Sequence, residues 1–261
     1  MPFRESNSIR YYTSELLDLN NLKHAFFTRH GGISPRPWES LNFGALVGDS
    51  TENVSENYHR AFSALDCSMD SRFDVWQVHS TEVVFAESPR LPHIPHIKAD
   101  IILTDNPELT LFMRFADCVP IMLLDPVKFV TGIVHSGWQG TVKQASAIAV
   151  KAMVERYGST TTNIIAVIGP SIGHQRYQVK QDVIAEVRKA FGKNAGKLYY
   201  SINDSTYLDL WEANRLILTQ SGVRQIEIVG ICTASQVEDW YSHRQENGST
   251  GRFGALITLG K

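Results

Sequence analysis

The stretch that decides the fold is residues 109–135, LTLFMRFADCVPIMLLDPVKFVTGIVH. It contains three short runs rich in β-branched, aromatic and aliphatic residues, 109–115, 119–124 and 129–135, which are separated by turn residues. The runs are apolar almost throughout, which is typical of strands covered on both faces. Because these strands follow one another without an intervening helix, they predict an α+β protein with mixed sheets rather than a doubly wound fold.

The flanking sequence adds strands before this stretch and alternating helices and strands after it. Strands are predicted at 74–79, 81–86, 99–104, 164–168 and 226–229, and helices at 50–67, 141–157, 181–191 and 210–220. In the first helix, Ser50 is positioned to cap the N-terminus, and Val54, Tyr58 and Phe62 share one face. No repeat or Gly/Ser linker divides the chain, which predicts a single domain over residues 1–261.

Composition excludes several classes of protein. The 261 residues are 43% hydrophobic and 20% charged, which rules out a disordered chain or a coiled coil. The net charge is -2 and no basic block occurs, so no nucleic-acid partner is expected. The apolar runs are shorter than the ~20 residues of a membrane span. Three widely spaced cysteines and no apolar leader predict a cytoplasmic protein. No feature of the sequence indicates an oligomeric state.

Three residues are candidates for chemistry: His79 in WQVHST, Cys118 in FADCVPIM and His135 in VHSGWQGT. Each lies at or beside the end of a predicted strand, where side chains converge. Two neutral imidazoles and one thiolate suit zinc, and three protein ligands leave a fourth position open for water or substrate. The same residue types also occur as a buried core cysteine with hydrogen-bonded histidines, so both interpretations stay open.

Gly137 and Gly140 follow His135 and lead into the helix predicted from residue 141. A helix N-terminus presents unpaired N–H groups and the positive end of its dipole, which suits an anion. The two glycines therefore predict a substrate-binding cradle for phosphate. A tight strand-to-helix turn is the other interpretation of the same residues.

Several polar residues in predicted loops are further candidates. Arg29 at the end of HAFFTRHGG presents forked donors that suit phosphate, although a surface ion pair is the commoner role. Asn42 lies in SLNFGALVGD as a candidate substrate ligand. Arg244 and Arg252 lie in SHRQENGSTGRF, which is either a binding loop or a solvated turn. The histidines of HIPH, at 93 and 96, are interpreted as surface residues.

Several known motifs are absent. The chain has no GxGxxG, GxxxxGK[ST] or HExxH, and it lacks the zinc-deaminase pattern. None of the nine histidines forms an H-x-H pair. A multicopper site needs on the order of ten imidazoles, mostly in such pairs, so copper is disfavoured as the cofactor.

The segments TRHGG, LNFGALVGD, WQVHST, ADCVPIMLLD, VHSGWQGT, GPSIG, LDL, ICT and TGR together resemble the polyphenol oxidase or laccase-domain family. Bacterial members of that family include a peptidoglycan editing factor. The resemblance extends from about Arg29 to Arg252. It implies one domain with mixed sheets layered between helices (α-β-β-α), distantly like a bacterial toxin deamidase.

The same resemblance implies a zinc ion held by His79, Cys118 and His135. It implies phosphorolysis of the purine nucleosides adenosine, inosine, guanosine and methylthioadenosine, together with deamination of adenosine. The partners are then small purine nucleosides and phosphate. Arg29 is expected to help hold phosphate, and Asp117 or another acid to relay protons, since the sequence does not choose one.

Two departures from the family pattern bear on that expectation. The family block HAGWRGT is here HSGWQGT, with Ser136 and Gln139 in place of Ala and Arg. If that arginine helps to hold phosphate, Gln139 weakens phosphorolysis. Many members also carry a cysteine after GPxIG and before a tyrosine, whereas this chain has Gln175 and Arg176 before Tyr177.

The main alternative is an amide hydrolase that edits a cell-wall precursor. Cys118 would then be the nucleophile, and His135 or His79 its base. A copper polyphenol oxidase and a non-catalytic zinc protein are the weaker alternatives. In the purine nucleoside interpretation the aromatic rings of Phe43, Trp76 and Trp138 are candidates for stacking on a base, or else belong to the core.

Overall fold

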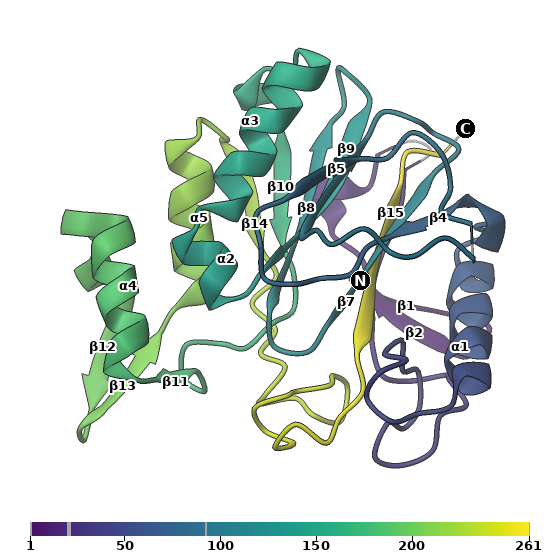
Figure 1. Cartoon of the computed structure of the whole chain (residues 1–261), viewed down its shortest axis with the longest axis horizontal. Coiled ribbons are helices and arrows are strands. Elements are labelled where there is room, and N and C mark those ends of the chain that lie inside the picture. The colour runs from purple at the N-terminus through teal and green to yellow at the C-terminus, as the bar shows by residue number, and fades with distance from the viewer. Residues whose placement is uncertain (1, 20–21, 92, 261) are drawn as a thin grey trace.

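Two six-stranded β-sheets pack face to face, and helices cover both outer faces, so the chain forms the predicted α-β-β-α arrangement (Figure 1). The computed structural model describes residues 2–19, 22–91 and 93–260. The central core between the sheets contains residues from both, such as Phe26 and Met113 from one and Met122 and Ile133 from the other. This arrangement confirms the single α+β domain with mixed sheets.

Both large sheets mix antiparallel with parallel pairs, and the parallel pairs lie at their edges. The first sheet has the strand order β1 (Phe3–Ser6), β2 (Ile9–Tyr12), β3 (Lys23–Phe27), β15 (Phe253–Thr258), β7 (Thr110–Phe115) and β4 (Arg72–Asp74). The second has the order β14 (Gln225–Ile228), β10 (Ile165–Ile168), β8 (Val119–Asp125), β9 (Val130–Ser136), β6 (Ile101–Thr104) and β5 (Val83–Phe85). The parallel pairs are β4–β7, β10–β14 and β5–β6. The chain therefore crosses from one sheet to the other between β7 and β8.

In the described residues, five α-helices and a small third sheet complete the fold. The helices are α1 (Thr51–Ala64), α2 (Trp138–Val142), α3 (Ala145–Tyr157), α4 (Gln181–Phe191) and α5 (Leu210–Gln220), with short 3-10 helices at Glu15–Leu17, Met69–Ser71, Thr161–Asn163 and Gly192–Lys197. The third sheet has the order β11 (Gln178–Val179), β13 (Ser205–Leu208) and β12 (Tyr199–Ile202), and it lies beside α4 (Figure 1). Within the described ranges, no helix has the length and apolar character needed to cross a membrane.

The apolar runs of the deciding stretch are strands that are covered on both faces. In β7, Leu111 and Met113 belong to the core between the sheets, whereas Phe112 packs in the outer cluster with α1. In β8, Met122 faces the central core and Leu123 faces the cluster under the other helices. Because successive side chains of a strand point to opposite faces, a strand buried on both sides has no polar alternation.

Two predicted elements were wrong in their bounds. Residues 75–79 do not continue β4, because His79 has a left-handed backbone (φ 58°) and the N–H groups of Val78 and His79 bind a side chain instead of a neighbouring strand. The helix predicted at 141–157 begins earlier, at Trp138, and is divided at Gln144, which also has positive φ (62°). The helices predicted at 181–191 and 210–220 are confirmed at those bounds.

One buried histidine predicts how the stability of the fold depends on pH. His24 in β3 is 4% exposed, and its Nε2 accepts a hydrogen bond from the Ser14 N–H at 2.8 Å. Burial lowers the pKa of His24 to about 4. Between pH 6.5 and 4 the unfolded chain therefore takes up a proton that the folded chain refuses, so the free energy of unfolding falls by about 3 kcal/mol as acid is added.

Replacing His24→Gln keeps an acceptor for the Ser14 N–H and removes the titration. We expect the loss of stability between pH 6.5 and 4 to become smaller by about 3 kcal/mol, as measured by urea unfolding at several pH values. His59→Gln is the matched control, because His59 lies exposed on α1. If the free energy of unfolding depends on pH equally in the two variants, the low pKa of His24 is not the cause of the loss of stability.

Candidate metal centre

The fold brings together the three residues that the sequence singled out. His79 lies in the irregular segment after β4, Cys118 lies where the chain crosses between the sheets, and His135 lies in β9. Their candidate ligand atoms all lie within 4.8 Å of one another, and Cys118 Sγ is 3.8 Å from His79 Nε2. The two imidazole rings meet edge to face with centroids 5.0 Å apart. The cluster therefore has the compactness of a metal centre.

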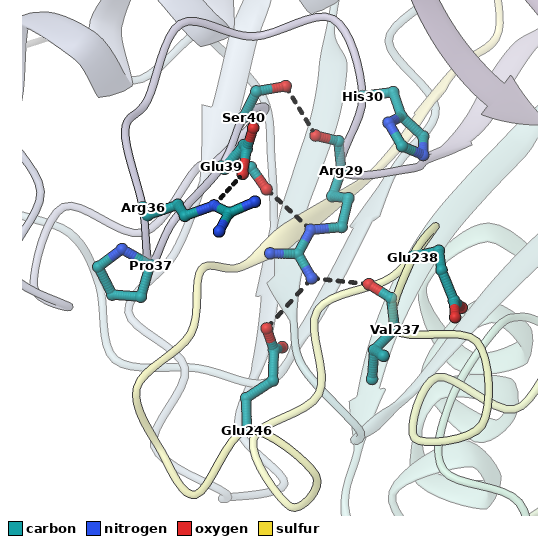
Figure 2. A pocket seen from close by; sticks show the side chains of 9 residues that line it. All are labelled: Arg29, His30, Arg36, Pro37, Glu39, Ser40, Val237, Glu238 and Glu246. Atoms are coloured by element: carbon teal, nitrogen blue, oxygen red, sulfur yellow. Dashed lines mark hydrogen bonds and ion pairs between the residues drawn. The ribbon is translucent and has the colours of Figure 1, made fainter.

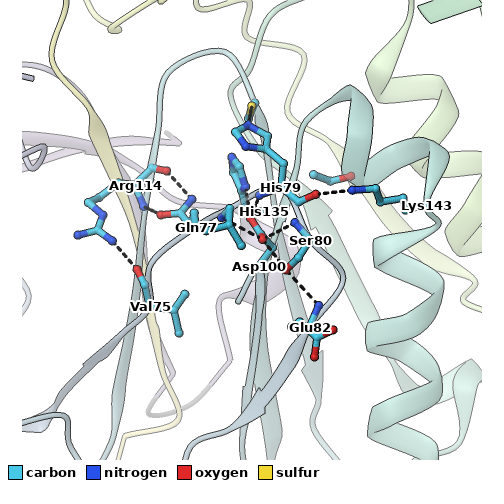
Figure 3. Close-up of polar contacts among 12 residues, drawn as sticks. Val75, Gln77, His79, Ser80, Glu82, Asp100, Arg114, His135 and Lys143 are labelled. Carbon is cyan, nitrogen blue, oxygen red and sulfur yellow. Dashed lines mark hydrogen bonds and ion pairs between the residues drawn. The ribbon is translucent and has the colours of Figure 1, made fainter. Parts of the chain in front are cut away.

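Asp100, a residue that the sequence analysis missed, holds two of these ligands in place. It is fully buried just before β6, and its Oδ1 accepts hydrogen bonds from His135 Nδ1 at 2.7 Å and from the His79 N–H at 3.0 Å (Figure 3). Its Oδ2 accepts bonds from the N–H groups of Val78 (3.1 Å) and Ser80 (2.6 Å) and from the Ser80 hydroxyl (2.8 Å). This carboxylate compensates for the strained backbone at His79. A signal existed in the sequence, since Asp100 is an acid directly before the apolar run Ile101, Ile102 and Leu103.

Hydrogen bonding and charge set the protonation of the cluster. Burial opposes ionisation of Asp100, but the hydrogen bond and charge of His135 outweigh it and lower the pKa of that carboxyl to about 2. Burial likewise opposes ionisation of the Cys118 thiol, yet the nearby His135 charge lowers its pKa. The Cys118 charge and the Asp100 hydrogen bond raise the pKa of His135 against the effect of burial. The cysteine is therefore poised as the thiolate, which is the form that binds metals.

The donor set fits a metal ion. With Nδ1 of His135 donating to Asp100, its Nε2 is left for a metal, which is the usual arrangement for a ligand histidine. Two nitrogens and one sulfur suit a tetrahedral ion with one open position. Gly137 supports this assignment, because a Cβ at that residue would lie only 2.7 Å from Cys118 Sγ. The absence of a side chain there preserves the space around the sulfur.

The candidate metal centre opens into a cavity of about 570 Å³. Aromatic rings of Trp76, Phe115 and Tyr177 line it, together with the loop Gly44–Val47. Beyond the metal centre itself, the lining groups that can carry positive charge are Arg114, Arg244, Arg252, His96 and His243. Asp117 is the only acid among the lining residues. The cavity therefore favours an anionic or electron-rich ligand that also has a flat apolar part.

Asp117 and Asn42, two of the predicted site residues, stabilise the walls of this cavity. Asp117 has a left-handed backbone (φ 79°), and its carboxylate accepts hydrogen bonds from the Thr233 hydroxyl at 2.7 Å and the Arg244 N–H at 2.6 Å. Asn42 is fully buried outside the cavity lining, and its Oδ1 accepts the Arg252 N–H at 2.8 Å. Both side chains are thus occupied in holding the C-terminal loop.

The glycines after His135 differ from each other in position. Gly137 has an extended backbone at the start of α2 and packs against Cys118 and His79. Gly140 lies inside α2, not in a loop before it, and a Cβ there would meet the His135 carbonyl at 3.2 Å. Because α2 has only five residues, its N-terminus is a weak anion site. Neither Gly140 nor Gln139 is among the residues that line the cavity.

This difference predicts unequal effects of adding a methyl group. Gly137→Ala places its Cβ against the Cys118 sulfur, so we expect the affinity for metal to fall about tenfold or more, which is comparable to losing a group that orients a ligand. In the control Gly140→Ala, the added atom meets no ligand atom, and metal affinity should stay within about threefold of the wild type. Competition with a chromogenic chelator measures both values. Equal losses would contradict the steric argument.

Arg29 lies in a different pocket, of about 510 Å³, whose lining does not include the metal ligands (Figure 2). Its Nη1 donates to the Val237 carbonyl at 2.7 Å and pairs with Glu246 at 3.1 Å, and its Nε donates to the Glu39 carbonyl at 2.8 Å. The guanidinium also stacks over Tyr241, 4.5 Å from the ring centroid. Arg29 therefore fastens the 237–246 segment, and its Nη1 and Nε donors are already in use.

The remaining candidates separate into cavity and core residues. Trp76 is 42% exposed and lines the cavity, whereas Phe43 is fully buried and Trp138 packs against the core under α3. The interpretation of His96 as a surface residue was wrong, because it lines the cavity and binds the buried Asp74 at 3.1 Å. His93 is exposed as expected. Arg176 is exposed outside the cavity lining, at 2.5 Å from Gln245.

Known proteins with similar sequences cover nearly all of the chain. Purine nucleoside phosphorylase YlmD of Bacillus subtilis is 38% identical over 90% of this chain and 87% of its own length. A purine nucleoside phosphorylase of Deinococcus radiodurans is 36% identical over 90% of the chain and 88% of its own.

Solved structures agree with the sequences. YfiH of Bacillus licheniformis, described as a hypothetical protein, superimposes with a TM-score of 0.91 at 33% identity and covers 99% of both chains. YlmD from Geobacillus stearothermophilus superimposes with a TM-score of 0.93 at 28% identity over 100% of this chain and 99% of its own. A family model described as multi-copper polyphenol oxidoreductase laccase matches residues 23–260. The chain therefore belongs to the multi-copper polyphenol oxidoreductase laccase family.

Proposed function

We propose that the protein is a zinc-dependent purine nucleoside phosphorylase. The observation that carries the proposal is the cluster of His79, Cys118 and His135, which opens into a cavity with both cationic and aromatic walls. Such a cavity suits two ligands together, a flat purine and an anion. The names of the relatives, purine nucleoside phosphorylases, support the same reaction.

Zinc suits the donor set better than copper does. Two imidazoles and one thiolate match its borderline softness, and when bound it supplies Lewis acidity at its open position. Among the described residues, His79, Cys118 and His135 form the one group of three or more possible metal ligands, so a second copper centre has no ligands there. The described part of the chain therefore lacks the several clustered imidazoles that multicopper oxidation requires.

In phosphorolysis an oxygen of hydrogen phosphate forms a bond to the ribose anomeric carbon while the glycosidic C–N bond breaks. The electron pair of that bond goes to the base, and the proton of hydrogen phosphate ends on the base. The products are ribose 1-phosphate and the free purine. The half-exposed face of Trp76 offers a stacking surface for the purine. Burial raises the pKa of Tyr177, which therefore stays a neutral O–H donor in the cavity.

Adenosine, inosine, guanosine and methylthioadenosine are the proposed substrates, and deamination of adenosine is the proposed second activity. These substrates share a purine and a ribose-derived ring, and no described contact selects among them. The proposed location is the reducing cytoplasm, because Cys67, Cys118 and Cys232 are all unpaired thiols.

The test is release of hypoxanthine from inosine by purified protein of known metal content. We expect release only when phosphate is present, with one ribose 1-phosphate formed for each base. Adenosine should in addition yield inosine and ammonia without phosphate. Phosphate-independent release, or none with zinc-loaded protein, would overturn the phosphorylase assignment.

One observation favours the second candidate, an amide hydrolase. Cys118 and His135 are mutually stabilised as thiolate and imidazolium, which is the arrangement of a cysteine nucleophile with its base. A sulfur that binds zinc is not free to attack an amide. Retention of activity toward a peptidoglycan precursor after complete removal of metal by a chelator would therefore support the hydrolase, and loss would support the metal enzyme.

A further inference from the structure

We infer that Arg252 and Arg244 form the phosphate subsite of the cavity. This assignment rests on the proposed phosphorylase function and replaces both sites expected from the sequence. Arg29 lies in another pocket with its Nε and Nη1 donors in use, and α2 is short, with its N-terminus packed against Cys118. The cavity must therefore supply its anion-binding charge from other side chains.

Arg252 is a mostly buried cation with no acidic partner. Among the described residues, no carboxylate oxygen lies within 4 Å of its guanidinium, although ten guanidinium–carboxylate pairs occur there. Its Nη1 donates only to carbonyls of its own loop, those of Thr250 at 3.3 Å and Gly251 at 2.8 Å. Burial lowers the pKa of Arg252, and the negative charges of Cys118 and Asp117 partly offset that effect. A buried guanidinium in that state gains stability from an anion in the cavity.

The stem of Arg252 is held firmly in place. Its N–H donates to Asn42, and its Cγ lies so close to Gly44 that a Cβ there would approach within 2.8 Å. Both contacts come from the segment LNFGALVGD, far from Arg252 in the sequence. The guanidinium is thus positioned before a ligand arrives, which reduces the entropy lost on binding.

Arg244 supplies the second cation from the same C-terminal loop. Its Nη1 donates to the Gln178 carbonyl at 2.7 Å, and its guanidinium lies over the Tyr177 ring, 5.1 Å from the centroid. It too has no carboxylate within 4 Å in the part of the chain that the structure describes. The backbone N–H of Arg244, by contrast, binds Asp117 at 2.6 Å.

The third arginine of the cavity differs from these two. Arg114 Nη1 lies 3.8 Å from the buried Asp74, and its Nη2 donates to the Val75 carbonyl. Arg114 is thus already paired, whereas Asp117, the one acid of the lining, binds a hydroxyl and a backbone N–H. Among the three arginines of the cavity, the positive charge that is not paired with a carboxylate therefore lies on Arg252 and Arg244. Both belong to the C-terminal loop that Asp117 holds in place.

The experiment compares Arg252→Gln and Arg244→Gln with the wild type at matched metal content. We expect the phosphate KM for inosine cleavage to rise about tenfold to 100-fold in each variant, because each loses a charge-assisted hydrogen bond to phosphate. The inosine KM should stay within about twofold. Arg252→Lys should recover part of the loss, since it restores charge but not the planar fork. Arg215→Gln, from an exposed ion pair with Glu212 on α5, is the matched control.

Titration of each protein with inorganic phosphate alone, followed by 31P NMR, separates this assignment from the reaction. If the wild type cleaves inosine but Arg252→Gln and Arg244→Gln have the same phosphate KM as the wild type, the two arginines do not form the phosphate subsite. The proposed phosphorylase function is then still supported. If the wild type binds phosphate but cleaves no nucleoside, loss of that binding in the variants supports the subsite while the function fails. Equal phosphate binding in all proteins, or none in the wild type, overturns the subsite.

A further arm identifies the source of the anion. Inosine 5′-monophosphate carries the same group attached to the nucleoside. If Arg252 and Arg244 bind inorganic phosphate, inosine 5′-monophosphate should compete with phosphate for the cavity. In the presence of phosphate, the enzyme should then cleave the monophosphate no faster than it cleaves inosine. Faster cleavage of the monophosphate, abolished by Arg252→Gln, would overturn the assignment to free phosphate.

Discussion

Cys118→Ala is expected to abolish tight metal binding and to reduce phosphorolysis by at least about 100-fold, while leaving a folded protein. The sulfur is one of three proposed ligands, and no other described cysteine, aspartate or glutamate joins the cluster to replace it. We expect the fold to persist without the metal, because three hydrophobic clusters among the described residues form its core. Elemental analysis, circular dichroism and the inosine assay measure the three properties.

Cys67→Ala is the control for this substitution. Cys67 is a half-buried thiol at the edge of the cluster under α1, outside the cavity lining. It should retain metal and activity. A Cys118→Ala protein that is unfolded would show that the metal is structural, and one that keeps its metal and activity would show that the cluster has been assigned wrongly.

Asp100→Asn is expected to weaken metal binding by about tenfold to 100-fold and to lower the free energy of unfolding by about 3 kcal/mol. The substitution removes the charge that faces His135. It also turns one acceptor oxygen into an NH2 group, which is placed against donors from Val78, His79 or Ser80. Both ligands that Asp100 orients therefore lose their support at once.

Ser80→Ala provides the graded comparison. It removes one hydroxyl bond to the same carboxylate but leaves the bonds from His135 and from all three N–H groups. We expect less than about a threefold change in metal affinity. A chelator competition assay and chemical unfolding measure both variants. If Asp100→Asn binds metal as the wild type does, the carboxylate does not orient the ligands.

The site differs from what the family description suggests. A multi-copper oxidoreductase requires several clustered imidazoles, but the described part of this chain gathers two histidines with one cysteine. The two arginines without acidic partners, on the other hand, suit a reaction in which phosphate is a substrate. The geometry therefore agrees with the names of the relatives better than with the description of the family model.

The sequence by itself determined the elements whose signals are local. The apolar runs at 119–124 and 129–135 predicted strands covered on both faces, and the period of 210–220 predicted α5 at its observed bounds. His79, Cys118 and His135 could be selected as ligands because few residue types bind metals at all. These conclusions depend on residue type and on spacing along the chain, which the sequence contains directly.

Only the tertiary structure decided which polar side chains surround the metal centre. Asp100 reaches His135 because β6 and β9 are neighbours in one sheet, and Arg252 reaches the cavity because Asn42 holds its loop. Arg29 carries the same guanidinium as Arg252, but Glu246 and two carbonyls satisfy it in another pocket. Whether an arginine is available to an anion depends on the acceptors that the fold places around it, and those acceptors lie far away in the sequence.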